Sequence, residues 1–270
     1  MINNELLMEL SDCGSTSGIA KIIHSHIPLN SEGYVDLELI AKSIGIINIS
    51  TKPLDQFEGI LVTNPEKTKA SIVVNSNNSP ERQRFTIAHE IGHFLIPTHN
   101  KNSSCAATDL SAYKSKDVKK NKEAEANSFA AELLIPASDF KKRINKEPDL
   151  EFILTLAGLY KVSKEALLRR YINLTDYSCA LIFGRGNKTR GYPQRTKDFP
   201  YIDVTSDDNT PEHIAENLKK LDVGDISDWY EIDTHYILSD PTEHDGCAVY
   251  AQTFKQQNNY HVSLLSFEEE

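Results

Sequence analysis

The spacing of hydrophobic residues predicts short helices and strands before residue 80. Residues 18–26 and 35–44 have helical spacing, and Gly45 supplies an end for the second helix. Two β-branched runs, GILVTN and ASIVVN, predict two strands joined by a turn around residues 64–69. The residues that follow, SPE from Ser79, are typical of a helix start. We therefore expect a small sheet followed by a helix.

The next segment, FTIAHEIGHFLI at residues 85–96, is hydrophobic around much of a helical circumference. A helix of this kind is expected in a domain core. Its interior glycine, Gly92, costs about 1 kcal/mol of helix stability relative to alanine, which indicates that another segment approaches the backbone there. The polar residues of this helix are two histidines and a glutamate, which are rarely buried unless they are paired or bound to a metal.

These polar residues, His89, Glu90 and His93, form an H-E-x-x-H motif. Positions i and i+4 share one face of a helix, so the two imidazoles can converge on one metal ion with Glu90 beside it. Zinc held by two imidazoles and a carboxylate keeps a position open for water and lowers the pKa of that water to about 7. Glu90 can then accept its proton. The motif fixes only three residues, but its hydrophobic setting favours the zinc-peptidase interpretation.

A third metal ligand is expected from EAEANSFAAELLIP, residues 123–136, whose hydrophobic residues have helical spacing. Glu123 and Asn127 are four residues apart and share a face, whereas Glu125 points elsewhere. We expect Glu123 to bind the metal and Asn127 to orient a ligating imidazole or carboxylate. Glu125 is interpreted as a solvated helix charge.

After Leu174 the pattern changes to short hydrophobic or alternating runs: SCALIFG, FPYIDV, DWYEID, CAVYAQTF and YHVSLLSF. These runs predict an α+β or mainly β C-terminal domain without a cluster of metal ligands. The expected fold class is thus α+β, with a helix-rich metallopeptidase domain over residues 1–175. Residues 176–270 would then sense a signal or select the substrate protein.

The chain has 270 residues, 39% of them hydrophobic, and a formal net charge of −10 from 29 basic and 39 acidic residues. Phosphate backbones would repel it, so direct nucleic-acid binding is not expected. Residues 156–174 have the rhythm of a helix-turn-helix joined at Val162 and Ser163. The alternative is a helical hairpin that packs against the protease core, and the acidic charge favours it.

The cysteines and the hydropathy of the chain indicate the cellular compartment in which we expect the protein. Cys13, Cys105, Cys179 and Cys247 are widely scattered without C-x-x-C spacing, and we interpret them as free thiols with packing roles. The first residues carry no basic leader, and no hydrophobic run approaches the roughly 18 residues of a membrane span. We therefore expect a cytoplasmic protein without membrane contact.

Three segments together resemble the ImmA/IrrE metallo-endopeptidases: RQRFTIAHEIGHFL from Arg82, EAEANSFAAELLIP from Glu123, and VDLELIAKSIGI from Val35. The resemblance covers about residues 15–175. It implies a zincin-like domain in which zinc is held by the two motif histidines and Glu123, with Glu90 as general base. It also implies a protein substrate, such as a helix-turn-helix repressor or an antitoxin-like partner. In this family the helical hairpin is a familiar feature.

The expected mechanism also requires a donor that stabilises the oxyanion. His99, just beyond the motif helix, and Tyr113, in a polar segment at residues 100–121 that we expect to be a loop at the cleft, are the candidates. Two other functions remain open. One is a DNA-binding regulator, and the other is a non-catalytic protein-binding module whose zinc only holds helices together. Such a structural zinc would need a fourth protein ligand, whereas the sequence offers three with suitable spacing.

Overall fold

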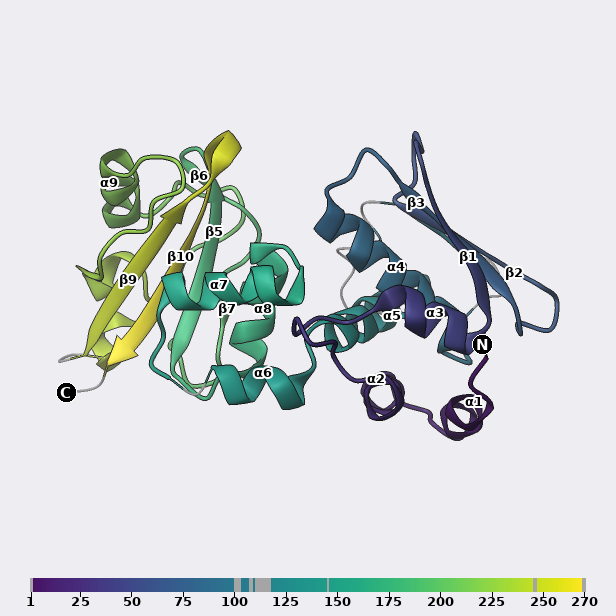
Figure 1. Cartoon of the computed structure of the whole chain (residues 1–270). Coiled ribbons are helices and arrows are strands. Elements are labelled where there is room, and N and C mark those ends of the chain that lie inside the picture. Colours follow the sequence, from purple (N-terminus) through teal and green to yellow (C-terminus); the bar gives the residue numbers. More distant parts are fainter. Residues whose placement is uncertain are drawn as a thin grey trace. The chain divides into compact units, whose positions relative to one another are not determined.

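The computed structural model describes residues 2–99, 103–106, 109, 118–144, 146–244 and 247–268. The chain divides into two compact units (Figure 1). Unit 1 comprises residues 1–140 and 157–166, and unit 2 comprises residues 141–156 and 167–270. The sequence predicts a single boundary after residue 175. In the structure, residues 157–166 of the helical hairpin belong to unit 1, and the rest of the hairpin belongs to unit 2.

Unit 1 contains a four-stranded sheet with the order β1-β3-β2-β4. Its strands are β1 (Ile46–Lys52), β2 (Gly59–Thr63), β3 (Ala70–Asn75) and β4 (Ser103–Cys105). The two predicted strands are β2 and β3, which pair antiparallel. Strand β1 runs parallel to β3 and was not predicted, because its exposed positions interrupt any hydrophobic alternation. Strand β4 pairs antiparallel with β2, so the expected loop at residues 100–121 is wrong for this part.

Helices cover this sheet and extend the core of unit 1 (Figure 1). They are α1 (Asn4–Ser11), α2 (Thr16–His26), α3 (Leu37–Ile44), α4 (Pro80–Leu95) and α5 (Val118–Leu134). Helix α4 carries the H-E-x-x-H motif and packs on β2, β3 and α5, while α2 packs on the far part of α5. Gly45 follows α3 with a φ of 101°, a left-handed conformation that glycine adopts without strain.

The approach of another segment to Gly92 is confirmed. A Cβ atom at this position would lie 2.9 Å from Cδ1 of Phe129 and 3.4 Å from Cα of Ala126, both on α5. The missing side chain lets the two helices approach closely. This close packing brings together the face of α4 that carries His89 and His93 and the face of α5 that carries Glu123.

The helical hairpin consists of α7 (Leu150–Tyr160) and α8 (Lys164–Leu174), and α6 (Ala137–Arg143) precedes it. Ser163 caps α8 by accepting a hydrogen bond from the backbone N–H of Ala166. The guanidinium of Arg169 lies 4.7 Å from the ring centroid of Phe183 within unit 2. One face of α8 is buried, comprising Leu167, Leu168, Tyr171 and Ile172. Helix α8 thus contacts unit 2 through Arg169, and the expected packing against the protease core stays a prediction.

Unit 2 is built on a sheet with the order β6-β5-β10-β9-β8, with β7 paired to β5 and helix α9 (Glu212–Lys220) packed on β9. Its strands are β5 (Cys179–Arg185), β6 (Lys188–Thr189), β7 (Gln194–Arg195), β8 (Tyr230–Ile232), β9 (Ala248–Lys255) and β10 (Tyr260–Glu268). Four of the predicted runs form strands, but FPYIDV makes only an isolated bridge between Ile202 and Leu238. The α+β class is confirmed.

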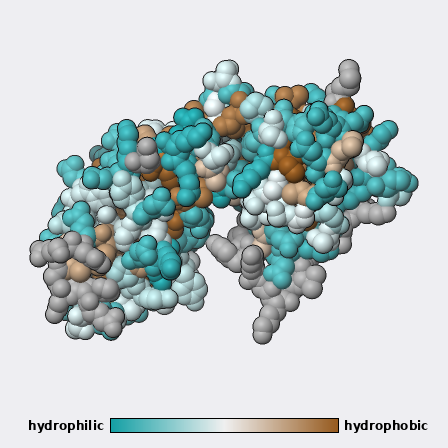
Figure 2. Space-filling view, turned by 90° about the horizontal axis from the view of Figure 1, so that it is seen from below, coloured by the Kyte–Doolittle hydropathy of each residue, from teal (hydrophilic) through white to brown (hydrophobic). Residues whose placement is uncertain are grey.

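The surface is mainly hydrophilic in Figure 2, with hydrophobic side chains in separate groups. Among the described residues, no helix combines the length and the hydrophobicity that crossing a bilayer requires.

Candidate metal centre

Helix α4 begins in the way its sequence predicts and delivers its motif to the core. Ser79 accepts a hydrogen bond from the N–H of Arg82, and Pro80 occupies the first turn. One turn apart, His89 and His93 are 0% and 3% exposed, so both imidazoles are shielded from bulk water.

The three expected metal donors lie together. The Nε2 atoms of His89 and His93 are 3.0 Å apart, and each lies 3.2 Å from Oε2 of Glu123 on α5. Tetrahedral zinc with bonds of 2.0–2.1 Å separates its ligand atoms by about 3.3–3.4 Å. The donor set therefore fits a zinc ion with little movement.

Hydrogen bonds behind the imidazoles set the tautomer of His89. Asn127 donates from Nδ2 to the carbonyl of Asp109, so its Oδ1 faces the Nδ1 atom of His89 at 2.9 Å as an acceptor. The imidazole therefore carries its proton on Nδ1 and directs the lone pair of Nε2 at the donor cluster.

A second chain of contacts lies behind His93. Its Nδ1 atom is 2.9 Å from Nδ1 of His99, whose Nε2 atom is 3.1 Å from Oε2 of Glu125. A proton on Nδ1 of His93 would again leave the Nε2 lone pair facing Glu123. Both ring nitrogens of His99 therefore have partners, His93 and Glu125, and His99 contacts the nitrogen of His93 that does not face Glu123. Glu125 points away from the donors, as its helical position predicts, but it contacts His99 and is not simply solvated.

The electrostatics of the cluster suit a cation. Burial acts against ionisation of Glu123, but its contacts with His89 and His93 hold the pKa of this carboxyl below its usual range. Burial lowers the pKa of His99 to about 4, so this imidazole is neutral at neutral pH. Two imidazole lone pairs and a carboxylate converge within 3.2 Å. Such a cluster of electron-rich atoms is stabilised by a bound cation.

Glu90 is fully buried beside the donors, on the side of strand β2. A Cβ atom at Gly59 would lie 3.2 Å from Oε1 of Glu90 and 2.4 Å from Cγ2 of Thr86. The glycine therefore leaves the space that the glutamate occupies.

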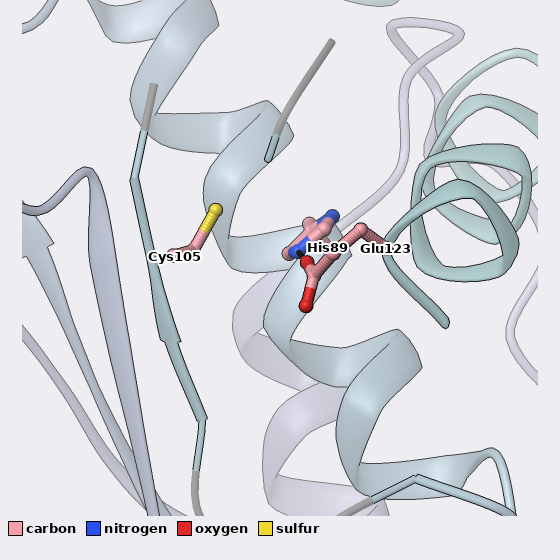
Figure 3. Close-up of side chains that lie close together, drawn as sticks. All are labelled: His89, Cys105 and Glu123. Carbon is pink, nitrogen blue, oxygen red and sulfur yellow. Dashed lines mark hydrogen bonds and ion pairs between the residues drawn. The ribbon is translucent and has the colours of Figure 1, made fainter. Parts of the chain in front are cut away.

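Cys105 is the member of the cluster that sequence reasoning missed. It pairs with Gly59 across β4 and β2, and the residue is 1% exposed. Its Sγ atom and the donor atoms of His89 and Glu123 all lie within 4.8 Å of one another. Figure 3 shows the three side chains gathered from β4, α4 and α5. Burial, together with the carboxylates of Glu90 and Glu123, raises the pKa of the thiol above its usual range.

Only the fold reveals the position of this cysteine, since no local spacing links it to the motif. Tyr113 lies outside the described residues. Among the described residues, candidate metal donors gather around His89 and Glu123, with Cys105 within 4.8 Å of both, and no such group is found in unit 2.

Parts of the chain are similar to known proteins. Residues 45–171 match the profile of a peptidase family described as the IrrE N-terminal-like domain. Among solved structures, a Mycobacterium tuberculosis transcriptional regulator is similar, with a TM-score of 0.59 at 13% identity over 93% of this chain and 87% of that one. At this identity the likeness concerns the fold alone. No curated protein matches the chain.

Proposed function

Because residues 45–171 form an IrrE N-terminal-like domain, we propose that the chain is a zinc-dependent endopeptidase. One observation carries the proposal: two histidine nitrogens and a carboxylate oxygen converge within 3.2 Å next to a buried glutamate. This is the donor set and the neighbouring base that metal-assisted peptide hydrolysis requires.

The metal would be held by His89, His93 and Glu123. Asn127 keeps the His89 ring in the ligating tautomer, and His99 does the same for His93. When bound, zinc supplies Lewis acidity for the scissile carbonyl and for the attacking water. These residues would thus hold the metal and orient its ligands, while proton transfer would be carried out by Glu90.

Glu90 is the proposed general base and acid. It would accept the proton of the attacking water and then deliver that proton to the leaving amine. Its carboxylate is buried beside the donors in the space left by Gly59, so it is held in place with few alternative positions. The engagement of both nitrogens of His99 favours a positioning role over that of oxyanion donor. Tyr113 remains the proposed oxyanion donor.

Strand β4 offers a place for an extended peptide. It is the last described strand of its sheet, and the carbonyl of Cys105 accepts a hydrogen bond from the N–H of Glu58, the residue before β2. Backbone groups alternate between neighbours along an antiparallel strand, so the peptide groups of Ser104 face the other edge. A substrate strand paired there would run past Cys105 and the donors.

The proposed substrate is a DNA-binding regulatory protein, such as a helix-turn-helix repressor or an antitoxin-like partner. The net charge of −10 favours association with a basic partner and disfavours direct contact with nucleic acid. A protein of similar fold is named a transcriptional regulator, which agrees with a regulatory setting. We further propose that unit 2 selects the substrate or senses a signal, because the described metal donors lie in unit 1.

A second candidate is a non-catalytic module in which the metal only stabilises the fold. The nearby thiol of Cys105 favours this alternative, because four protein ligands are typical of structural zinc sites.

The substitution Glu90→Gln separates the two functions. Glutamine keeps the size of the side chain but accepts no proton, so cleavage of a captured partner protein should fall by about 10²–10⁴-fold while zinc content stays unchanged. Glu81→Gln, in the first turn of the same helix, is the matched control and should cleave like the wild type. Partners retained by Glu90→Gln in cells are identified by mass spectrometry and incubated with wild-type protein, with and without a chelator. Equal cleavage by Glu90→Gln and the wild type would refute Glu90 as the general base, whereas metal-bound wild type that cleaves none of the captured partners would leave the non-catalytic module as the better interpretation.

A further inference from the structure

Cys105 occupies a defined place beside the proposed metal site. Strand pairing holds its backbone against Gly59, and the Cys105 carbonyl accepts a hydrogen bond from Glu58. Within the described part of the chain, its thiol donates one weak hydrogen bond, to the carbonyl of Ala106 at 3.6 Å. This contact competes poorly with a metal ion for the sulfur.

The thiol is close enough to reach a metal held by the other donors. Zinc–sulfur and zinc–nitrogen bonds of about 2.3 and 2.0–2.1 Å place tetrahedral ligand atoms about 3.5 Å apart. The Sγ atom of Cys105 already lies within 4.8 Å of the donor atoms of His89 and Glu123, so each of these two distances has to shorten by at most about 1.3 Å. Rotation between two χ1 rotamers moves a cysteine sulfur by about 3 Å. Rotation about χ1 is therefore large enough in magnitude to supply this shift.

We propose that the Cys105 thiolate is a fourth protein ligand of the metal, which closes the site in a resting form of the protein. Zinc binds thiolate more readily than it binds neutral water, and the proton of the thiol is released as the bond forms. The proposal rests on the metallopeptidase function and adds its regulation.

The closed form would be inactive for a geometric reason. A fourth protein ligand takes the position that water needs in a catalytic zinc site. Cys105 also approaches from the side of Glu90, since its strand partner Gly59 is the residue that makes room for that carboxylate. Dissociation of the thiolate and its reprotonation would restore the open form, with three protein ligands.

Cobalt substitution of the full chain tests the proposal without a substrate. Thiolate ligation gives cobalt a strong near-ultraviolet charge-transfer band, whereas histidine and carboxylate ligation gives only the weaker visible bands. The wild type should show the charge-transfer band, and Cys105→Ser and Cys105→Ala should lose it while keeping bound cobalt. Cys179→Ser, which removes another buried thiol, is the matched control and should keep the band. Zinc affinity should fall by about tenfold or more in both Cys105 variants.

A complementary variant covers the case in which Cys105 substitutions disturb folding. Serine at Cys13, Cys179 and Cys247 leaves Cys105 as the one remaining cysteine, and the band should persist. Cobalt bound to the wild type with visible bands but no charge-transfer band would overturn the thiolate ligand and leave the peptidase proposal intact. Failure of the wild type to bind cobalt or zinc would refute both.

Discussion

Replacing Gly92 with alanine tests whether the close approach of α4 and α5 builds the metal site. In a helix interior, alanine is favoured over glycine by about 1 kcal/mol. Here the new Cβ atom would lie 2.9 Å from Cδ1 of Phe129, a fully buried ring with little freedom to withdraw. Overpacking a core in this way costs about 1–3 kcal/mol. The net expectation is a loss of about 0–2 kcal/mol in the free energy of unfolding.

The same substitution should also weaken metal binding. Relief of the clash requires α5 to move away from α4, and α5 carries Glu123 and Asn127. A shift of a few tenths of an ångström would disturb both the donor and the group that orients His89. We expect zinc affinity to fall by about tenfold, the lower end of the effect of losing an orienting contact.

Gly158→Ala is the matched control, because Gly158 lies on a helix of the same unit and an added Cβ atom would have no neighbour within 4 Å. It should stabilise the protein by up to about 1 kcal/mol and leave zinc affinity unchanged. Urea unfolding followed by circular dichroism in the presence of a chelator measures both stabilities, and competition with a chromophoric chelator measures zinc affinity. If Gly92→Ala were as stabilising as Gly158→Ala, with zinc affinity unchanged, the close approach of α4 and α5 would be refuted.

Two further substitutions probe a contact of the site and the core of unit 2. Asn127→Ala removes the acceptor for Nδ1 of His89 and should weaken zinc binding by about 10–100-fold in chelator competition; an unchanged affinity would show that another group fixes the imidazole. Burial lowers the pKa of His261 from 6.5 to about 4. The neutral buried imidazole therefore contributes its full stability above pH 6.5, and the free energy of unfolding falls by about 1.4 kcal/mol per pH unit as the pH falls from 6.5 towards 4. His261→Gln should reduce the pH dependence of the unfolding free energy between pH 6.5 and 5 by that amount, and an equal slope in both proteins would contradict a buried neutral imidazole.

Local sequence patterns were sufficient for features that depend on neighbouring residues. The spacing of His89 and His93 places both on one face of α4 because a helix repeats every 3.6 residues. Spacing also ranked Glu123 above Glu125, and the structure brings Glu123 to the histidines. Hydrophobic periodicity predicted β2, β3 and the main strands of unit 2, since each buries one face or both.

Other features depended on pairing between distant segments. Strand β1 was missed because its parallel pairing with β3, and not its own periodicity, holds it in the sheet. The hairpin was predicted, but its assignment to two units depends on contacts between residues far apart in the sequence, which local spacing does not reveal. His99 was one of two candidate oxyanion donors in the sequence, and only the structure shows that it contacts His93, because the chain turns back at the end of α4.

By itself, the sequence determined the motif helix and the donors it presents, because their geometry follows from the repeat of a helix. Tertiary structure alone decided that Cys105 belongs with them. Its place depends on the register of β4 against β2, which aligns it with Gly59 beside Glu90. Register is set by hydrogen bonds between strands far apart in the chain, so a thiol that reads as isolated in the sequence becomes a neighbour of the metal donors.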